Sequence, residues 1–172
     1  MESRPIKILF LLLLTSFILA GSSMAQNGIK EDLFEGFIYY SDKQKISLKS
    51  VKKRFASSLN SYLLGREIVK TLLEGPSLSS LEPTWPKDVT LNSFFISYDG
   101  KAFVDLNVQP EMVEQMDVHS ELLAVYSMVN SLTLNIPKIK MVKILIQGND
   151  AVTLAGHIDL EYFYKTNMLI VK

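Results

Sequence analysis

Residues 120–148 constrain the fold of this 172-residue chain more than any other stretch. Apolar residues first recur there at steps of three and four, which places them on one face of a predicted α-helix. That face carries Leu122, Val125, Tyr126, Val129, Leu132 and Thr133. Pro137 ends the helix, because proline lacks a backbone N–H and disfavours the helical conformation of the preceding residue. Residues 141–147 then alternate as in a β-strand that stops at Gly148. This helix and strand need a sheet to cover their apolar faces, and the rest of the chain must supply it.

The other segments alternate between strand and helix patterns. A first helix ends at Glu74, because Gly75 favours a helix end and Pro76 prevents continuation. Asp99-Gly100 predicts a tight hairpin turn. The predicted strands are residues 34–41, 45–55, 89–97, 102–106 and 141–147. The order β-β-α-β-β-α-β predicts an α+β fold, with a mostly antiparallel sheet and two helices packed on one face. We expect its core to include Leu122, Val129, Leu132, Val142, Ile144 and Ile146.

Residues 1–25 have the three-part pattern of a secretory signal peptide. Arg4 and Lys7 precede about a dozen apolar residues, and small residues lead to a cut after Ala25. The apolar run is shorter than the roughly 20 residues that a membrane-spanning helix needs. We therefore expect cleavage after Ala25 and export, to the periplasm or the exterior of a bacterium. Contact with the membrane is expected only if the signal stays uncleaved.

The remaining chain divides into three predicted parts. Residues 26–36 are expected to form a flexible leader, 37–160 one folded domain, and 161–172 a C-terminal extension whose weak alternation suggests an edge strand. The loop from Pro76 to Asp88 is long for a connection without secondary structure, and such loops often carry function. It holds Trp85, the only tryptophan of the chain.

Charge and cysteine content exclude several classes of partner. Without Arg4, Lys7 and Glu2 of the predicted signal, the 18 basic and 18 acidic residues become 16 and 17, a formal charge of −1. This balance does not favour nucleic acid or an anionic membrane surface. The chain has no cysteine, so it has neither disulfides nor the residue that carries the lipid of a bacterial lipoprotein.

Candidate reactive residues are few. His119 lies between acids that favour a helix start, and His157 lies in a predicted loop, so capping and loop roles are favoured over a base or a metal ligand. Asp105 ends a strand, and a hydrogen bond to nearby backbone N–H groups is its favoured role. Trp85 is expected to cover the core. We predict no catalytic, cofactor-binding or metal-binding residue, and keep Trp85 and Asp105 as interaction candidates.

Several short motifs, in their order along the chain, together resemble the GerMN domain of sporulation and germination proteins. They are Leu72-Leu73-Glu74-Gly75-Pro76, Trp85 to Leu91, Asp99 to Asn107, Ala124 to Thr133 with Ile136-Pro137, Val142 to Gly148, and Leu154 to Ile158. The resemblance covers roughly residues 37–160. It implies a small α+β domain similar to ring-building motifs, a non-enzymatic interaction role in the cell envelope, and structural turns at Gly75, Pro76, Asp99 and Gly100. Pro137, Gly148 and Gly156 are the other expected turn residues.

Three functions follow as expectations. The first is an exported domain that binds a protein partner in the envelope or associates with itself. The second is a binder of cell-wall glycan or peptide, or an accessory to a hydrolase, using the Trp85 loop. The third is a sporulation or germination factor, although the chain shows one domain copy where the familiar sporulation protein has two.

Overall fold

The computed structural model describes residues 32–172, so the predicted signal peptide and residues 26–31 lie outside the described part. Its elements are β1 (Leu33–Asp42), β2 (Leu48–Ala56), α2 (Ser61–Glu74), β3 (Leu81–Glu82), β4 (Thr90–Ile96), β5 (Lys101–Asn107), α3 (Pro110–Val113), α4 (Val118–Thr133) and β6 (Met141–Ile146). The α+β class and the order of the main elements are confirmed. The two-residue strand β3 and the short helix α3 are added to that order.

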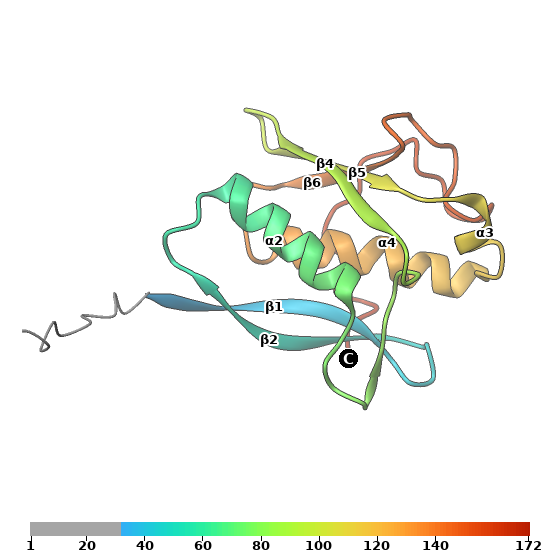
Figure 1. The fold of residues 1–172 in the computed structure, drawn as a ribbon, viewed down its shortest axis with the longest axis horizontal. Helices are drawn as coiled ribbons and strands as arrows, with labels where there is room; N and C mark the ends of the chain where they lie inside the picture. The colour runs from blue at the N-terminus through green and yellow to red at the C-terminus, as the bar shows by residue number, and fades with distance from the viewer. Residues whose placement is uncertain (1–31) are drawn as a thin grey trace, which may run out of the picture. The chain divides into compact units, whose positions relative to one another are not determined.

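The strands form two three-stranded sheets in place of the single predicted sheet. Sheet A has the order β2-β1-β3 and sheet B the order β4-β5-β6. Helices α2 and α4 lie between them, and each contacts strands of both sheets (Figure 1). In sheet B, β5 and β6 run parallel, because α4 carries the chain back to the end from which β5 started.

Sheet A stays separate from sheet B because β1 turns part of its edge toward α4. The Phe37 N–H donates to Asn135 Oδ1 over 2.8 Å, and the Tyr39 N–H donates to Ser131 Oγ over 3.0 Å. These side chains take the places that a further strand would occupy. The central part of β1 is also buried on both faces, because Ile38 and Tyr40 lie in the main core and Tyr39 lies in a second cluster.

Strand β1 begins at Leu33, one residue before the strand predicted at residues 34–41. Residues 33–36 also fall in the segment 26–36 that was expected to be a flexible leader, and in the structure they pair with β2 in continuous antiparallel register. Phe34 lies against Phe55 with ring centroids 5.8 Å apart, and this contact gives the segment a reason to be ordered.

Both long helices begin with a side-chain cap. Asn60 Oδ1 accepts the Leu63 N–H at the start of α2, and Asp117 Oδ1 accepts the Ser120 N–H at the start of α4. Helix α2 ends at Gly75, whose φ of 86° suits glycine.

Helix α4 is buried on more than the one predicted face. Val129 and Leu132 are buried as expected, whereas Leu122 is only half-buried. Leu123, Ala124 and Met128 are buried instead. The physical reason is that α4 is covered by both sheets and by the C-terminal segment, so a single apolar stripe does not describe it.

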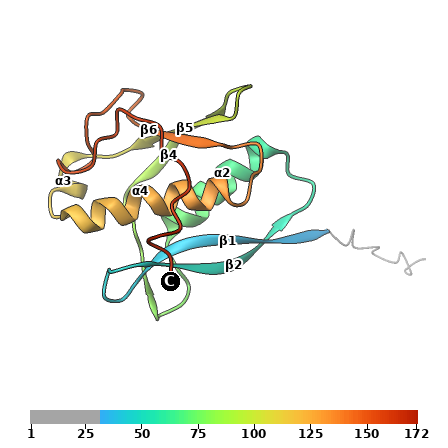
Figure 2. The same ribbon diagram turned by 180° about the vertical axis from the view of Figure 1, so that it is seen from behind.

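The C-terminal segment, residues 161–172, crosses from one sheet to the other (Figure 2). Tyr164 forms an antiparallel bridge with Val142 of β6, and Val171 forms a parallel bridge with Leu48 of β2. Between these points Asn167 exchanges two hydrogen bonds with the buried Asn130 side chain of α4. The segment thus makes isolated bridges with two sheets, where one edge strand was expected.

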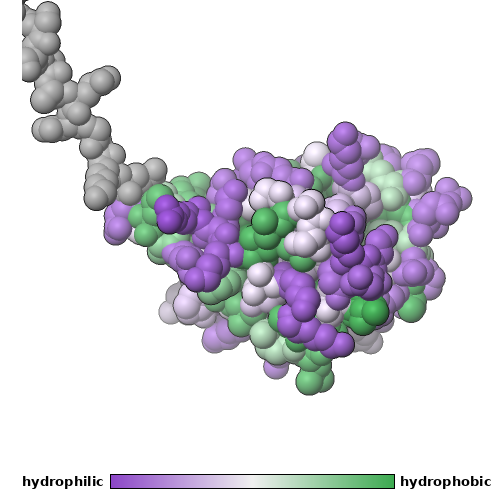
Figure 3. Space-filling view, turned by 90° about the horizontal axis from the view of Figure 1, so that it is seen from below, coloured by the Kyte–Doolittle hydropathy of each residue, from purple (hydrophilic) through white to green (hydrophobic). Residues whose placement is uncertain are grey.

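Hydrophilic residues cover much of the molecule when it is seen from the side of β1 and β2 (Figure 3). Lys52, Lys53 and Arg54 of β2 contribute exposed positive charge. Within residues 32–172 no helix is long and apolar enough to cross a membrane.

Candidate functional site

Trp85, in the long loop between α2 and β4, packs into the main core, as predicted. Its side chain is 2% exposed. The neighbouring Thr84 Oγ1 lies 2.8 Å from Ser127 Oγ, and Ser127 donates its own proton to the Ala124 carbonyl, so Thr84 is the donor of that pair. The loop is therefore attached to α4 directly beside the tryptophan. The Trp85 Nε1–H has no hydrogen-bond partner in the described part of the chain.

A pocket of about 310 Å³ opens beside Trp85. Its floor includes the buried Thr84 and Leu123, and its rim carries the exposed Lys45 and Lys87. Ser120, from the first turn of α4, also lines it. The positive end of the helix dipole and two lysines make this pocket more suitable for an anionic group than for a cationic one.

Asp105, the second interaction candidate, is 4% exposed and engaged inside the fold. Its Oδ1 accepts the Gly148 N–H over 2.7 Å, and its Oδ2 accepts from Asn92 Nδ2. The carboxylate thus joins the bulge of β4 to the turn after β6, and the predicted hydrogen bond to backbone is present. Asp105 does not line the Trp85 pocket, so the two candidates do not form one site.

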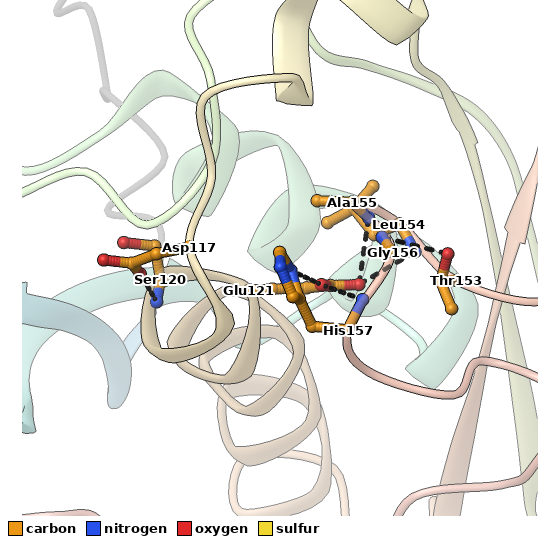
Figure 4. Close-up of polar contacts among 8 residues, drawn as sticks. All are labelled: Asp117, Ser120, Glu121, Thr153, Leu154, Ala155, Gly156 and His157. Carbon is orange, nitrogen blue, oxygen red and sulfur yellow. Dashed lines mark hydrogen bonds and ion pairs between the residues drawn. The ribbon is translucent and has the colours of Figure 1, made fainter.

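The densest polar arrangement surrounds Glu121, which the sequence interpretation treated only as a helix-start acid (Figure 4). Its side chain is fully buried. Oε1 accepts the N–H groups of Leu154 and Ala155, both over 2.9 Å, and Oε2 accepts the His157 N–H over 2.9 Å. His157 Nδ1 also lies 3.0 Å from Oε2. Glu121 therefore holds residues 154–157 against the start of α4.

The sequence around Glu121 does not signal this arrangement. Glu121 lies two positions from His119 and would be expected among solvated first-turn acids. Glu121 is a buried anchor because its carboxylate accepts N–H groups of residues 154–157, and these contacts join residues more than 30 positions apart. Local patterns do not report such a contact.

Lys143 is a second buried charge that the sequence interpretation did not single out. It lies on β6, and its Nζ contacts Asp150 Oδ1 at 2.9 Å and donates to the Glu161 carbonyl over 2.6 Å. The lysine thus fixes the start of the C-terminal segment over sheet B. In the alternation of the strand, Lys143 points to the face opposite Val142 and Ile144.

The two histidines are not brought together. His119 Nε2 lies 3.1 Å from the Ile46 carbonyl, in the turn between β1 and β2, whereas His157 contacts Glu121. Among the residues that the structure describes, no group of three or more His, Asp or Glu side chains is placed to hold a metal ion.

The expected turn residues occupy turns or element ends. Backbone φ is positive at Gly75, Gly100, Gly148 and Gly156. Gly100 is the most restricted of them, because a Cβ there would lie 2.6 Å from the Lys138 carbonyl oxygen. Asp99 pairs with Lys101 and accepts from Ser97 Oγ in the same hairpin, and these contacts lower the pKa of Asp99 to about 2. Pro76 follows the end of α2, and Pro137 follows the end of α4.

Three solved structures share this fold. A protein from Clostridium perfringens described as a lipoprotein is 24% identical, with a TM-score of 0.56 over 83% of this chain and 93% of that one. The tandem GerMN domains of the sporulation protein GerM from Bacillus subtilis are 22% identical, with a TM-score of 0.63 over 88% of this chain and 51% of that one. The first GerMN domain of the same protein is 20% identical, with a TM-score of 0.55 over 76% and 97%.

The sequence itself matches a family. No curated protein matches the chain. The family model described as "Germane: Sporulation and spore germination" matches residues 37–152, which is well over half of the chain. This protein therefore belongs to the Germane family of GerMN-type domains.

Proposed function

We propose that this chain is a non-enzymatic, exported domain of the bacterial cell envelope that binds a protein partner. The observation that carries the proposal is the family match over residues 37–152. The names of two relatives in fold, a lipoprotein and a sporulation protein, support an envelope location. The pattern of residues 1–25 supports export.

The buried charges support the non-enzymatic part of the proposal. Glu121, Asp105 and Lys143 each hold a turn or segment through backbone or fixed side-chain contacts. A group that acts as a base or nucleophile must instead reach a substrate in a pocket. These three side chains are therefore assigned to holding the fold, and function is left to the surface.

The direct test is covalent crosslinking of a C-terminally tagged full-length chain in the bacterium that produces it. The envelope fraction is purified through the tag, and crosslinked proteins are identified by mass spectrometry. The matched control is the same tag exported by residues 1–25 alone. We expect one protein to be enriched repeatedly over the control. Recovery of nothing beyond the control, with the chain correctly exported, contradicts the proposal.

Export has a separate readout. N-terminal sequencing of the chain from the envelope or medium should begin at Gln26. A chain that keeps Met1 and fractionates with membrane would instead indicate an uncleaved anchor.

A second candidate function rests on the pocket beside Trp85. Its size and its rim of Lys45 and Lys87 favour a cell-wall peptide or glycan with an anionic group. Trp85 is the only tryptophan, so its fluorescence reports on this pocket alone. Titration with purified wall fragments should change that fluorescence, and Lys87→Gln should weaken the response. Lys138→Gln, outside the pocket, is the control, and an unchanged spectrum at all fragment concentrations excludes this function.

A third candidate is a role in sporulation or germination, favoured by the family description and by the name of the Bacillus subtilis relative. Deletion of the gene in a spore-forming host should lower the yield of heat-resistant spores. Complementation with the full-length chain is the control, and an unchanged yield contradicts this role.

A further inference from the structure

The exposed edges of the two sheets differ in how they are protected from pairing with other chains. An open sheet edge presents unpaired N–H and C=O groups to other chains, and proteins commonly protect it by charge or by covering. On β2 both devices are present. The C-terminal segment pairs with Leu48, and the exposed remainder of the strand carries Lys52, Lys53 and Arg54.

Two further edges are covered by side chains or by other segments. On β1, Ser131 and Asn135 occupy part of the edge opposite β2, and β3 pairs with Ser41 and Asp42. On β6, Val142 exchanges both backbone hydrogen bonds with Tyr164 at 2.8 Å each. The fold therefore covers part of each of these two edges.

The outer edge of β4 is protected neither by charged residues nor by a covering segment within the described residues. It is the edge strand of sheet B, and no described strand pairs with its outer side (Figure 1). Its sequence from Thr90 to Ile96, TLNSFFI, has no charged residue and no proline. Phe95 is 59% exposed and lies on the outer face of the sheet, 6.2 Å from Phe103 between ring centroids.

The backbone of β4 is oriented for a further strand. Ser97 donates its N–H to the Lys101 carbonyl, and Phe95 lies opposite Phe103 in the same register. Because antiparallel hydrogen bonds alternate along a strand, Phe94 and Ile96 direct their N–H and C=O groups away from β5. The bulge near Asn92 ends this regular stretch on one side.

We propose that β4 pairs antiparallel with β4 of a second copy of this chain, about a two-fold axis at Phe95. In this register Phe94 of each copy lies opposite Ile96 of the other, and the two outward-directed sets of backbone groups exchange hydrogen bonds. Phe95 then lies opposite its own counterpart, at the spacing where cross-strand aromatic pairs stabilise a sheet. The two copies of sheet B become one continuous six-stranded sheet.

The charges of the edge strands favour a second copy of this chain as the partner of β4. In an antiparallel two-fold pairing, the residue on the axis lies opposite its own counterpart and the residues on either side of it lie opposite one another, so a run of like charges faces a run of the same sign. The neutral β4 avoids this repulsion, whereas β2, with Lys52, Lys53 and Arg54, cannot pair with itself favourably. A short edge buries little area, so the association is weak and grows with protein concentration.

This inference goes beyond the proposed function and depends only on the fold. It is tested on the purified full-length chain by sedimentation velocity over increasing concentration. We expect a monomer–dimer equilibrium that Phe95→Lys abolishes, because two lysines then face each other. Val152→Lys is the matched control, since it adds the same charge at an exposed apolar residue far from β4 in sequence and should leave the equilibrium unchanged.

A crosslinking variant tests the register itself. The chain has no cysteine, so Phe95→Cys introduces a single thiol. Under mild oxidation it should form a disulfide-linked dimer faster than Val152→Cys. The proposal is overturned if the wild-type chain stays monomeric at every concentration, if Phe95→Lys leaves the dimer intact, or if the two cysteine variants dimerise at equal rates. A partner recovered from the envelope would stand unaffected by any of these results.

Discussion

Glu121 of α4, which is fully buried, and the exposed His157 of the loop after β6 meet with Oε2 and Nδ1 3.0 Å apart. The same carboxylate accepts three backbone N–H groups from residues 154, 155 and 157. The pair therefore joins two parts of the chain that the sequence separates by 36 residues.

Glu121→Ala should destabilise the domain strongly. It leaves three backbone N–H groups without their acceptor, and breaking a buried charged network typically costs about 3–5 kcal/mol. The measurement is the free energy of unfolding from urea denaturation. Glu111→Ala, at an exposed acid on α3, is the control and should change it by less than about 0.5 kcal/mol. Equal effects of the two variants would show that Glu121 does not anchor the loop.

Asn130→Ala should loosen the C-terminal segment more than the core. Asn130 is fully buried, and its amide donates to the Asn167 carbonyl over 2.8 Å and accepts the Asn167 N–H over 2.9 Å. Loss of both bonds should lower the free energy of unfolding by about 1–3 kcal/mol. Hydrogen exchange followed by mass spectrometry should show faster exchange in residues 161–172 than in β5. Uniform acceleration across the domain would contradict this division.

Gly65→Ala should destabilise the domain, although alanine has the higher helix propensity. Glycine inside a helix is less favourable than alanine by about 1 kcal/mol, so the sequence of α2 alone favours the substitution. In the structure a Cβ on Gly65 would overlap the ring of Phe94, which is itself buried. We expect a net loss of about 1–3 kcal/mol, as in other overpacked cores.

The same substitution can be tested by compensation. Combining Gly65→Ala with Phe94→Leu should cost less than the sum of the two single changes, because the smaller side chain removes the overlap. If the two costs simply add, the loss of stability in Gly65→Ala does not come from overlap with the Phe94 ring.

Tyr40 should make the domain sensitive to alkali. Burial, with a smaller contribution from the charge of Glu74, raises the pKa of Tyr40 to about 12. Its hydroxyl donates to the Thr71 carbonyl over 2.8 Å. The unfolded chain loses this proton near pH 10, whereas the folded chain keeps it, so stability is full below about pH 10 and falls as the pH rises toward 12.

The check is the free energy of unfolding as a function of pH for the wild type and for Tyr40→Phe. Between about pH 10 and 12, the free energy of unfolding should fall less for Tyr40→Phe than for the wild type. Tyr98→Phe, at a fully exposed tyrosine, should keep the wild-type decline. A wild-type curve that is flat over this range would contradict the assignment.

The sequence predicted those elements whose cause is local. Periodicity and end signals placed both long helices, and Asp99-Gly100 placed the β4–β5 hairpin. The number of sheets was not predictable in this way, because it depends on whether β1 offers its edge to a strand or to Ser131 and Asn135. Local patterns carry no information about that choice.

The candidate residues were predicted in part. Trp85 is buried in the core, as expected, and the carboxylate of Asp105 accepts a backbone N–H, but that N–H belongs to Gly148, 43 positions along the chain. Glu121 was missed because charged residues near a helix start are usually solvated, and its burial depends on a loop far along the chain. Leu122 was placed in the core in error, because α4 is enclosed from more than one side.

The bridge between Leu48 and Val171 also sets the order in which the domain can be completed. A growing chain produces β1 and β2 early, yet the edge of β2 stays open until residue 171 has been synthesised. Contacts between distant parts of a chain form late, because the intervening loop must first be ordered. Until that bridge forms, the lysines and arginine of β2 protect the open edge, so the charge of this strand acts before the fold is complete.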